Sequence, residues 1–320
     1  MRLFFIGNKA IKDEKQLTEY TGIIILNKPK RITSHDCIIR LRKLLKMKRI
    51  GHTGTLDPDV TGVLPICLGK ATKIAEYITD AGKEYIGEVT LGFSTTTEDQ
   101  SGDIVDKKVI DCTITRAEIL AVFEQFTGEI TQTPPMFSAV KVNGKRLYEY
   151  ALDGQVINRP SRKVTISELE LLDEQSSFSG ETISFSFRVA CSKGTYIRTL
   201  AVMIGEKLGY PAHMSRLVRS RSAQYTLENA LTLEEVASLI ETEQLMQHIQ
   251  PIESGVSGMP FQIANEVLAK RIANGALLAV EHDLPTLSEP TAIFNQVGQL
   301  LAIYQNHPSK EGILKPVKII

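Results

Sequence analysis

Several features that would place this chain in a common class are missing from its sequence. It contains no tryptophan, and no apolar run approaches the roughly 18 residues that a membrane-spanning helix needs. The opening MRLFFIGNKA is apolar, but it is shorter than a signal-peptide core and lacks a small-residue cleavage site. We therefore expect a buried first strand there, and a cytoplasmic protein.

Motifs for metals and nucleotides are also absent. The four cysteines stand alone, without a Cys-x-x-Cys pair or a histidine at metal spacing, so we expect reduced thiols and no metal site. The segment GVLPICLGKAT (62–72) resembles a phosphate-binding loop, but Leu64 replaces its first glycine and Ala71 replaces its serine or threonine. A dinucleotide motif is missing as well, so the sequence predicts no nucleotide cofactor.

Charge is balanced overall but unevenly distributed. The 37 basic residues match 37 acidic ones, so net charge does not indicate a nucleic-acid partner. Residues 22–73, however, hold 11 basic and 3 acidic residues. This local excess could be a footprint for nucleic-acid phosphates, since clustered cations displace counterions together, or simply the solvated face of a helix.

Strand and helix patterns mix without a strict β-α-β rhythm, which predicts an α+β fold. We expect strands over 22–27, 85–91 and 182–190, the last from its strict apolar–polar alternation. We expect helices after the N-caps Ser34, Thr115 and Thr232, and another from 195 to Gly209. The Pro/Gly/Ser-rich stretch after residue 250 predicts a linker, followed by one short helix and several short strands.

The loop at 51–58 holds the most informative cluster of reactive side chains. It carries His52, Thr53, Thr55 and Asp57 on a backbone rich in glycine, so we expect no regular structure there. Proline at 58 keeps Asp57 out of the helical region, which can point the carboxylate outward in a fixed direction. An aspartate that only caps a turn is the competing interpretation.

Five ordered segments resemble one enzyme family. GHTGTLDPDVTGVLP (51–65) is similar to the catalytic motif of the TruB family, the bacterial tRNA pseudouridine-55 synthases. The other four occur in the family's order: LNKPKRITSHD (26–36), KEYIGEVTLG (83–92), PPMFSAVKVNGKRLYEYA (134–151) and CSKGTYIRTLA (191–201). The ending LKPVKII (314–320) is similar to the small PUA-type RNA-binding domain appended to that family.

This resemblance implies roles for individual residues. Asp57 matches the catalytic nucleophile, Tyr85 the tyrosine that stacks on the target base and takes the C5 proton, and Arg198 the arginine that pairs with the aspartate. Substrate-binding positions follow in the same way: His52, which fills the space left by the flipped base, Leu217 beside the base, Asp99 at the flipped nucleotides, Tyr196, and Lys28 with Pro29 as support. One departure is Thr96, where the family often has aspartate.

The resemblance also implies an architecture and partners. A catalytic domain would span 1–250, with a mixed, largely antiparallel bisected sheet and a thumb-like insertion at about 132–160. A β-rich PUA-like domain would span 251–320. The partner would be the T-arm of tRNA, bound by a monomer without cofactor, metal or membrane.

The chemistry suits these residue types. Pseudouridine is an isomer of uridine, so neither ATP nor a redox cofactor is needed, and one carboxylate can add to C1′ or C6 or start a glycal route. A guanidinium beside the aspartate stabilises its charge, and an aromatic ring offers a stacking face worth about 1–3 kcal/mol. Two alternatives remain, namely a tRNA-binding or folding module without essential chemistry and a guide-RNA-dependent synthase.

Overall fold

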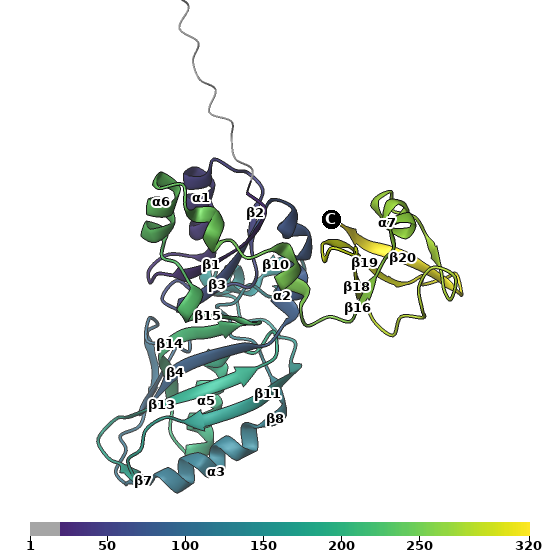
Figure 1. The fold of residues 1–320 in the computed structure, drawn as a ribbon. Helices are drawn as coiled ribbons and strands as arrows, with labels where there is room; N and C mark the ends of the chain where they lie inside the picture. Colours follow the sequence, from purple (N-terminus) through teal and green to yellow (C-terminus); the bar gives the residue numbers. More distant parts are fainter. Residues whose placement is uncertain (1–19) are drawn as a thin grey trace, which may run out of the picture.

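The computed structural model of this chain describes residues 20–320. The expected strand within the first ten residues therefore lies outside the described part. The fold is α+β and is built on a nine-stranded sheet whose main path runs β1-β3-β14-β4-β13-β11-β8 (Figure 1). Its strands are β1 (Gly22–Lys28), β2 (Ile50–His52), β3 (Thr61–Leu68), β4 (Lys83–Leu91), β8 (Gly128–Gln132), β11 (Arg162–Leu171), β13 (Ile183–Cys191), β14 (Ala212–Ser222) and β15 (Tyr225–Thr226).

The sheet consists of two halves that meet along a short parallel contact. β14 pairs antiparallel with β4 along its length, but it pairs parallel with β3 only through Val218 and Arg219. Gly62 makes this approach possible, because a Cβ there would lie 2.2 Å from the backbone oxygen of Arg219. The two halves match the bisected sheet that the family resemblance implied, and the junction is where the reactive residues gather.

Helices pack against each half of the nine-stranded sheet and bury apolar side chains there. α1 and α6 pack together beside β1, while α3 and α5 lie against the other half (Figure 1). The helices are α1 (Ser34–Leu45), α2 (Ala75–Asp80), α3 (Arg116–Phe126), α4 (Leu147–Leu152), α5 (Ile197–Leu208), α6 (Leu233–Glu241) and α7 (Glu266–Ala273). Short 3₁₀ turns are η1 (Gly69–Ile74), η2 (Leu227–Asn229), η3 (Leu245–His248) and η4 (Ile252–Val256).

The predicted helix starts are confirmed at two of three positions. Thr115 and Thr232 form capping boxes at α3 and α6. The predicted cap at Ser34 is wrong by one residue, because Thr33 accepts the Asp36 amide and Ser34 is already helical and buried. The hydroxyl of Ser34 is occupied elsewhere, in the loop that carries Asp57.

The segment 132–160 contains a short hairpin and a short helix. Its strands are β9 (Lys141–Val142) and β10 (Lys145–Arg146), joined at Asn143 and Gly144, both with positive φ as a tight hairpin turn requires. α4 follows directly. Two other small strand pairs are formed by β5 (Phe93–Thr95) with β6 (Ile104–Lys107) and by β7 (Ile114–Thr115) with β12 (Ser177–Phe178).

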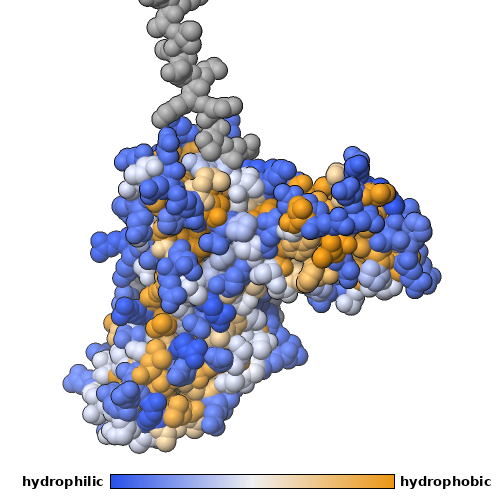
Figure 2. All heavy atoms as spheres, viewed as in Figure 1, coloured by the Kyte–Doolittle hydropathy of each residue, from blue (hydrophilic) through white to orange (hydrophobic). Residues whose placement is uncertain are grey.

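The last sixty residues form a separate five-stranded sheet with α7 packed on it (Figure 1). Its order is β16-β18-β19-β20-β17, with strands β16 (Phe261–Ile263), β17 (Leu278–Ala279), β18 (Thr291–Phe294), β19 (Leu300–Asn306) and β20 (Ile313–Ile319). The expected linker is partly structured, since Ile252 and Val256 of η4 are buried. Hydrophobic surface is visible where this sheet meets the larger body (Figure 2).

Candidate functional site

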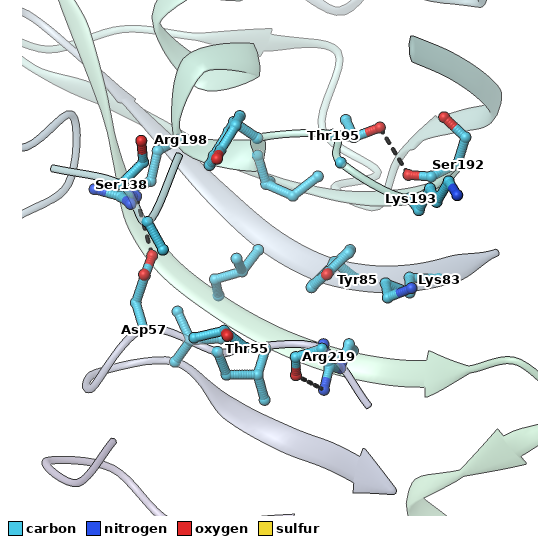
Figure 3. A pocket seen from close by; sticks show the side chains of 18 of the residues that line it. Thr55, Asp57, Lys83, Tyr85, Ser138, Ser192, Lys193, Thr195, Arg198 and Arg219 are labelled. Atoms are coloured by element: carbon cyan, nitrogen blue, oxygen red, sulfur yellow. Dashed lines mark hydrogen bonds and ion pairs between the residues drawn. The ribbon is translucent and has the colours of Figure 1, made fainter. Parts of the chain in front are cut away.

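A cavity of about 390 Å³ opens at the junction between the two halves of the sheet. Its walls come from the loop after β2, the start of β4, the turn before α5 and the middle of β14 (Figure 3). Asp57 and Arg198 lie at one side, while Tyr85 and Arg219 line the interior. Segments far apart in the sequence thus converge on one hollow, which brings together most of the residues singled out above.

Buried hydrogen bonds fix the loop that presents Asp57. The hydroxyl of Ser34 accepts the Leu56 amide at 2.9 Å and donates to the Leu56 carbonyl at 3.2 Å. The Thr53 amide donates to the Pro65 carbonyl at 3.1 Å. The loop predicted to be irregular is in fact regular at its start, because residues 50–52 pair with β3 as β2. After it, the Val60 amide donates to the Asp57 carbonyl at 3.1 Å, so Asp57 is held from both sides.

Lys28 stabilises this loop through hydrogen bonds to backbone carbonyls. Its side chain is fully buried, and its ammonium donates to the carbonyls of Pro29, Ile32 and Pro58 at 2.9, 2.6 and 3.0 Å. Burial lowers the pKa of Lys28 from its usual value. Because this ammonium is enclosed, it cannot contribute to the basic surface over 22–73, which corrects its inclusion in that phosphate footprint. Pro29 lies beside it and is half-buried.

Asp57 and Arg198 form the ion pair at the cavity. Arg198 Nε lies 3.0 Å from Asp57 Oδ2, and the arginine side chain is 6% exposed while the aspartate side chain is 41% exposed. Desolvation raises the pKa of the Asp57 carboxyl, and Arg198 opposes that rise. The geometry leaves one side of the carboxylate open to the cavity while its charge is balanced from behind (Figure 3).

Apolar and aromatic side chains form another part of the cavity wall. Tyr85 and Leu217 are both buried, at 8% and 9% exposed, and both line the cavity. Enclosure raises the pKa of the Tyr85 phenol, which Arg219 partly offsets. Tyr196 also lines the cavity, and the Arg162 guanidinium lies 4.7 Å from its ring centroid. The aromatic rings in this wall could stack on a planar ligand.

Two buried cationic residues of the cavity carried no role in the sequence interpretation. Arg219 is fully buried, and it donates from Nε to the Val63 carbonyl at 2.6 Å and from Nη2 to the Gly54 carbonyl at 3.2 Å. Lys83 donates to the carbonyls of Thr79 and Ala81, and burial lowers its pKa to about 8. Lys83 begins the segment KEYIGEVTLG, so the resemblance could have drawn attention to it. Arg219 lies close to Arg216 and Arg221 in the sequence, a pattern that is typical of a surface strand.

A second hollow of about 620 Å³ continues from Asp57 on its other side. Asp99 and Leu217 line it, and Asp99 Oδ2 lies 3.8 Å from Arg198 Nη1. The carboxylate of Asp99 also accepts the Ser101 amide, so its direction is fixed. Thr96 is exposed, and its hydroxyl accepts the Asp103 amide at 3.2 Å.

His52 is a predicted site residue that does not join this arrangement. It lies half-buried on β2, outside the residues that line either hollow. Within residues 20–320, its buried Nδ1 has no hydrogen-bond partner. Burial lowers its pKa, and the charge of Arg219 acts in the same direction. Both effects favour the neutral imidazole.

Metal-binding clusters and membrane-spanning helices are not found in the described part of the chain. No group of three or more His, Cys, Asp or Glu side chains is placed to hold a metal ion there. No helix within 20–320 is long and apolar enough to cross a bilayer. The four cysteines are free thiols, of which Cys112 is exposed.

Comparisons with known proteins point to one family. Residues 42–197 match the TruB family pseudouridylate synthase N-terminal domain, and residues 198–257 match the tRNA pseudouridylate synthase B C-terminal domain. The tRNA pseudouridine synthase B of Bacillus cereus is 54% identical over 299 residues, covering 93% of this chain and 97% of its own. That of Geobacillus thermodenitrificans is also 54% identical, covering 93% and 99%.

Solved structures agree at the level of the fold. The crystal structure of a Cbf5-Nop10-Gar1 complex is similar over 93% of this chain and 84% of that one, with 29% identity and a TM-score of 0.72. An H/ACA RNP bound to a substrate RNA containing 2′-deoxyuridine matches with a TM-score of 0.70 and 26% identity, over 93% of this chain and 84% of that one. The shared architecture is the pseudouridine synthase fold with a C-terminal β-rich domain.

Proposed function

The chain belongs to the TruB family of pseudouridylate synthases, and from this premise we propose that it isomerises uridine 55 in the T-arm of tRNA, with Asp57 as nucleophile. One observation supports this most directly. A carboxylate paired with a buried arginine faces a cavity that Tyr85 and Leu217 also line. A uracil flipped from its stack would find a reactive oxygen on one side and an aromatic face on the other.

The reaction needs only groups that the cavity already holds. The N1–C1′ bond breaks, the uracil turns, C5 bonds to C1′ and the C5 proton is lost while N1 gains one, so substrate and product are isomers. Asp57 would attack C1′ or C6, or remove the C2′ proton on a glycal route. We assign Tyr85, which lines the cavity, to stacking on the base and relaying the C5 proton, with its phenol releasing its own proton as it takes up the new one. Arg198 would keep the carboxylate ionised.

Other parts of the chain would hold the RNA. We assign Asp99 and the second hollow to nucleotides next to the target, because Asp99 faces that space beside Asp57. Tyr196 lies in the cavity wall, Lys28 and Pro29 support the loop, and His52 would take the vacated position in the arm. We further propose that the 132–160 insertion closes on the arm, that 251–320 is a PUA-like RNA-binding domain, and that the monomer works in the cytoplasm.

Conversion of an unmodified tRNA transcript by the purified chain tests this proposal. We expect pseudouridine at position 55 by chemical mapping, without added protein, guide RNA or cofactor. Asp57→Asn should abolish product while tRNA affinity stays within about threefold, because the amide keeps the shape of the side chain but removes the anionic nucleophile and little contact surface. Asp106→Asn, an exposed carboxyl on β6, is the matched control.

Three outcomes would contradict the proposal. Turnover by Asp57→Asn protein would remove Asp57 from the nucleophile role. Tight tRNA binding by the wild-type chain without any product would instead favour a tRNA-binding or folding module, and product only with added guide RNA would favour a guided synthase.

A further inference from the structure

The guanidinium of Arg198 is held by three separate segments of the chain. Besides the Asp57 contact through Nε, its Nη1 donates to the Thr97 carbonyl and its Nη2 to the Phe137 carbonyl, each at 2.9 Å. Thr97 belongs to the loop after β5, and Phe137 to the start of the 132–160 insertion. The direction in which Arg198 meets Asp57 therefore depends on where these two backbone carbonyls lie.

The loop that supplies the Thr97 carbonyl is anchored by its next residue, Glu98. The Glu98 carboxylate accepts a hydrogen bond from the Thr199 hydroxyl at 2.6 Å, and its backbone carbonyl accepts the Met214 amide at 3.0 Å. Thr199 follows Arg198 in the first turn of α5. Neighbouring residues of the loop thus bind neighbouring residues of the helix, Thr97 to Arg198 and Glu98 to Thr199.

The backbone of Glu98 has an unfavourable conformation. Its φ of 63° lies in the left-handed region, which is unfavourable for a residue with a long side chain. Such a conformation persists only where the surroundings determine it, and here the contacts to α5 and β14 do so. The same turn carries Asp99, whose Oδ2 lies 3.8 Å from Arg198 Nη1.

We infer that Glu98 and Thr199 are positioning residues, whose hydrogen bond holds the Thr97 carbonyl on Arg198 and so keeps the guanidinium directed at Asp57. This inference rests on the proposed function, because its consequence is measured on the Asp57 reaction. Without the anchor, Nη1 would lose its acceptor in a place where the arginine side chain is 6% exposed. The guanidinium would then turn to find another partner, and its support of the carboxylate would weaken.

The rival explanation is that Glu98 acts on the site through its negative charge rather than through its hydrogen bond to Thr199. The charged groups that act on Glu98 are Arg198, Arg159 and Asp99. Those that act on Asp57 are Arg198, Asp99 and Lys28. If Glu98 acted through its negative charge, Glu98→Gln would alter the reaction as strongly as Glu98→Ala. If it acts as a hydrogen-bond acceptor, glutamine would preserve the function, because its amide oxygen can accept the Thr199 hydroxyl.

Thr199→Val and Thr199→Ser form the matched pair for the test, since valine keeps the shape and loses the hydroxyl while serine keeps the hydroxyl. Single-turnover rates are measured by release of tritium from 5-tritiated uridine in tRNA, across a pH series. We expect Thr199→Val and Glu98→Ala to slow the reaction about tenfold, with tRNA affinity within about twofold. The acidic limb of their pH profiles should move to higher pH, because the Asp57 carboxylate is less well supported.

Serine at 199 and glutamine at 98 should stay within about twofold of the wild-type rate, and the Glu98→Ala/Thr199→Val double variant should be no slower than either single change. A wild-type rate and pH limb in Thr199→Val would overturn the inference. So would a lower melting temperature and rate with the pH limb unmoved, which is the signature of a purely structural contact. An inactive wild-type chain would instead mean that the proposed function has failed.

Discussion

The carboxyl group of Asp57 lies under two opposing influences. Desolvation at the cavity raises its pKa, whereas the Arg198 guanidinium 3.0 Å away favours the anion. Because the net pKa is raised, protonation starts at a higher pH than for a free aspartate, and each proton bound removes a nucleophile. We expect the single-turnover rate to fall as pH drops through that raised pKa.

Replacement of Arg198 should move the acidic limb of the pH–rate profile to higher pH. Arg198→Lys keeps one charge but loses the planar group that binds Asp57, Thr97 and Phe137 together. We expect a rate at least about tenfold lower and an acidic limb shifted to higher pH. Arg188→Lys, on a surface cluster with Glu84, Glu168 and Glu170, is the control. A limb displaced to lower pH would contradict this electrostatic account.

The residues of the site were visible in the sequence to different degrees. Asp57, Tyr85 and Arg198 lie in recognisable motifs, and the structure brings all three to one cavity. Arg219 was not found, because a fully buried arginine whose partners are backbone carbonyls leaves no sign in local sequence. Glu98 was missed for the same reason, since its partner Thr199 is about a hundred residues away.

Helices and strands were predictable wherever a local rule applied. Capping boxes and 3.6-residue periodicity located α3 and α6, and alternation located β13. β14 was not predicted, although it joins both halves of the sheet. Its sequence AHMSRLVRSRS includes three arginines and resembles a surface segment, and its pairing with β3 and β4 is a long-range property.

The basic end of α1 supports a prediction about RNA affinity. Arg42, Lys43 and Lys48 are exposed and surround a shallow hollow after the helix. Removing one cation that binds a phosphate should reduce the slope of log affinity against log salt by about 0.7–0.9. Lys43→Gln with Lys48→Gln should therefore reduce that slope by about 1.5, measured by filter binding of tRNA at several salt concentrations.

The control for this experiment removes the same charge from other places. Lys107 on β6 and Lys207 on α5 are also exposed, and their double glutamine variant should keep the wild-type slope. Equal effects of both double variants would mean that only net charge matters. An unchanged slope in the α1 variant would leave this helix as an ordinary solvated face.

The C-terminal sheet and the larger body share buried apolar surface. Leu300 and Ile303 of β19 belong to the same hydrophobic cluster as Ile23, Ile74 and Val256. Polar contacts cross the same junction, since Lys73 donates to the Ile319 carbonyl, Lys318 pairs with Glu76 at 3.2 Å and the Leu300 amide donates to Glu253 at 2.9 Å. A freely jointed domain would leave such apolar groups in water.

This shared cluster predicts that both parts of the molecule unfold together. Leu300→Ala should remove about 2–5 kcal/mol from the free energy of unfolding and lower the melting temperature of a single calorimetric transition. Val297→Ala, in the same sheet region but 79% exposed, should leave the transition within about 0.5 kcal/mol. If Leu300→Ala instead splits off a low-temperature transition and leaves the main one in place, the two parts are independent. In that case the junction cannot transmit the position of the C-terminal sheet to the cavity.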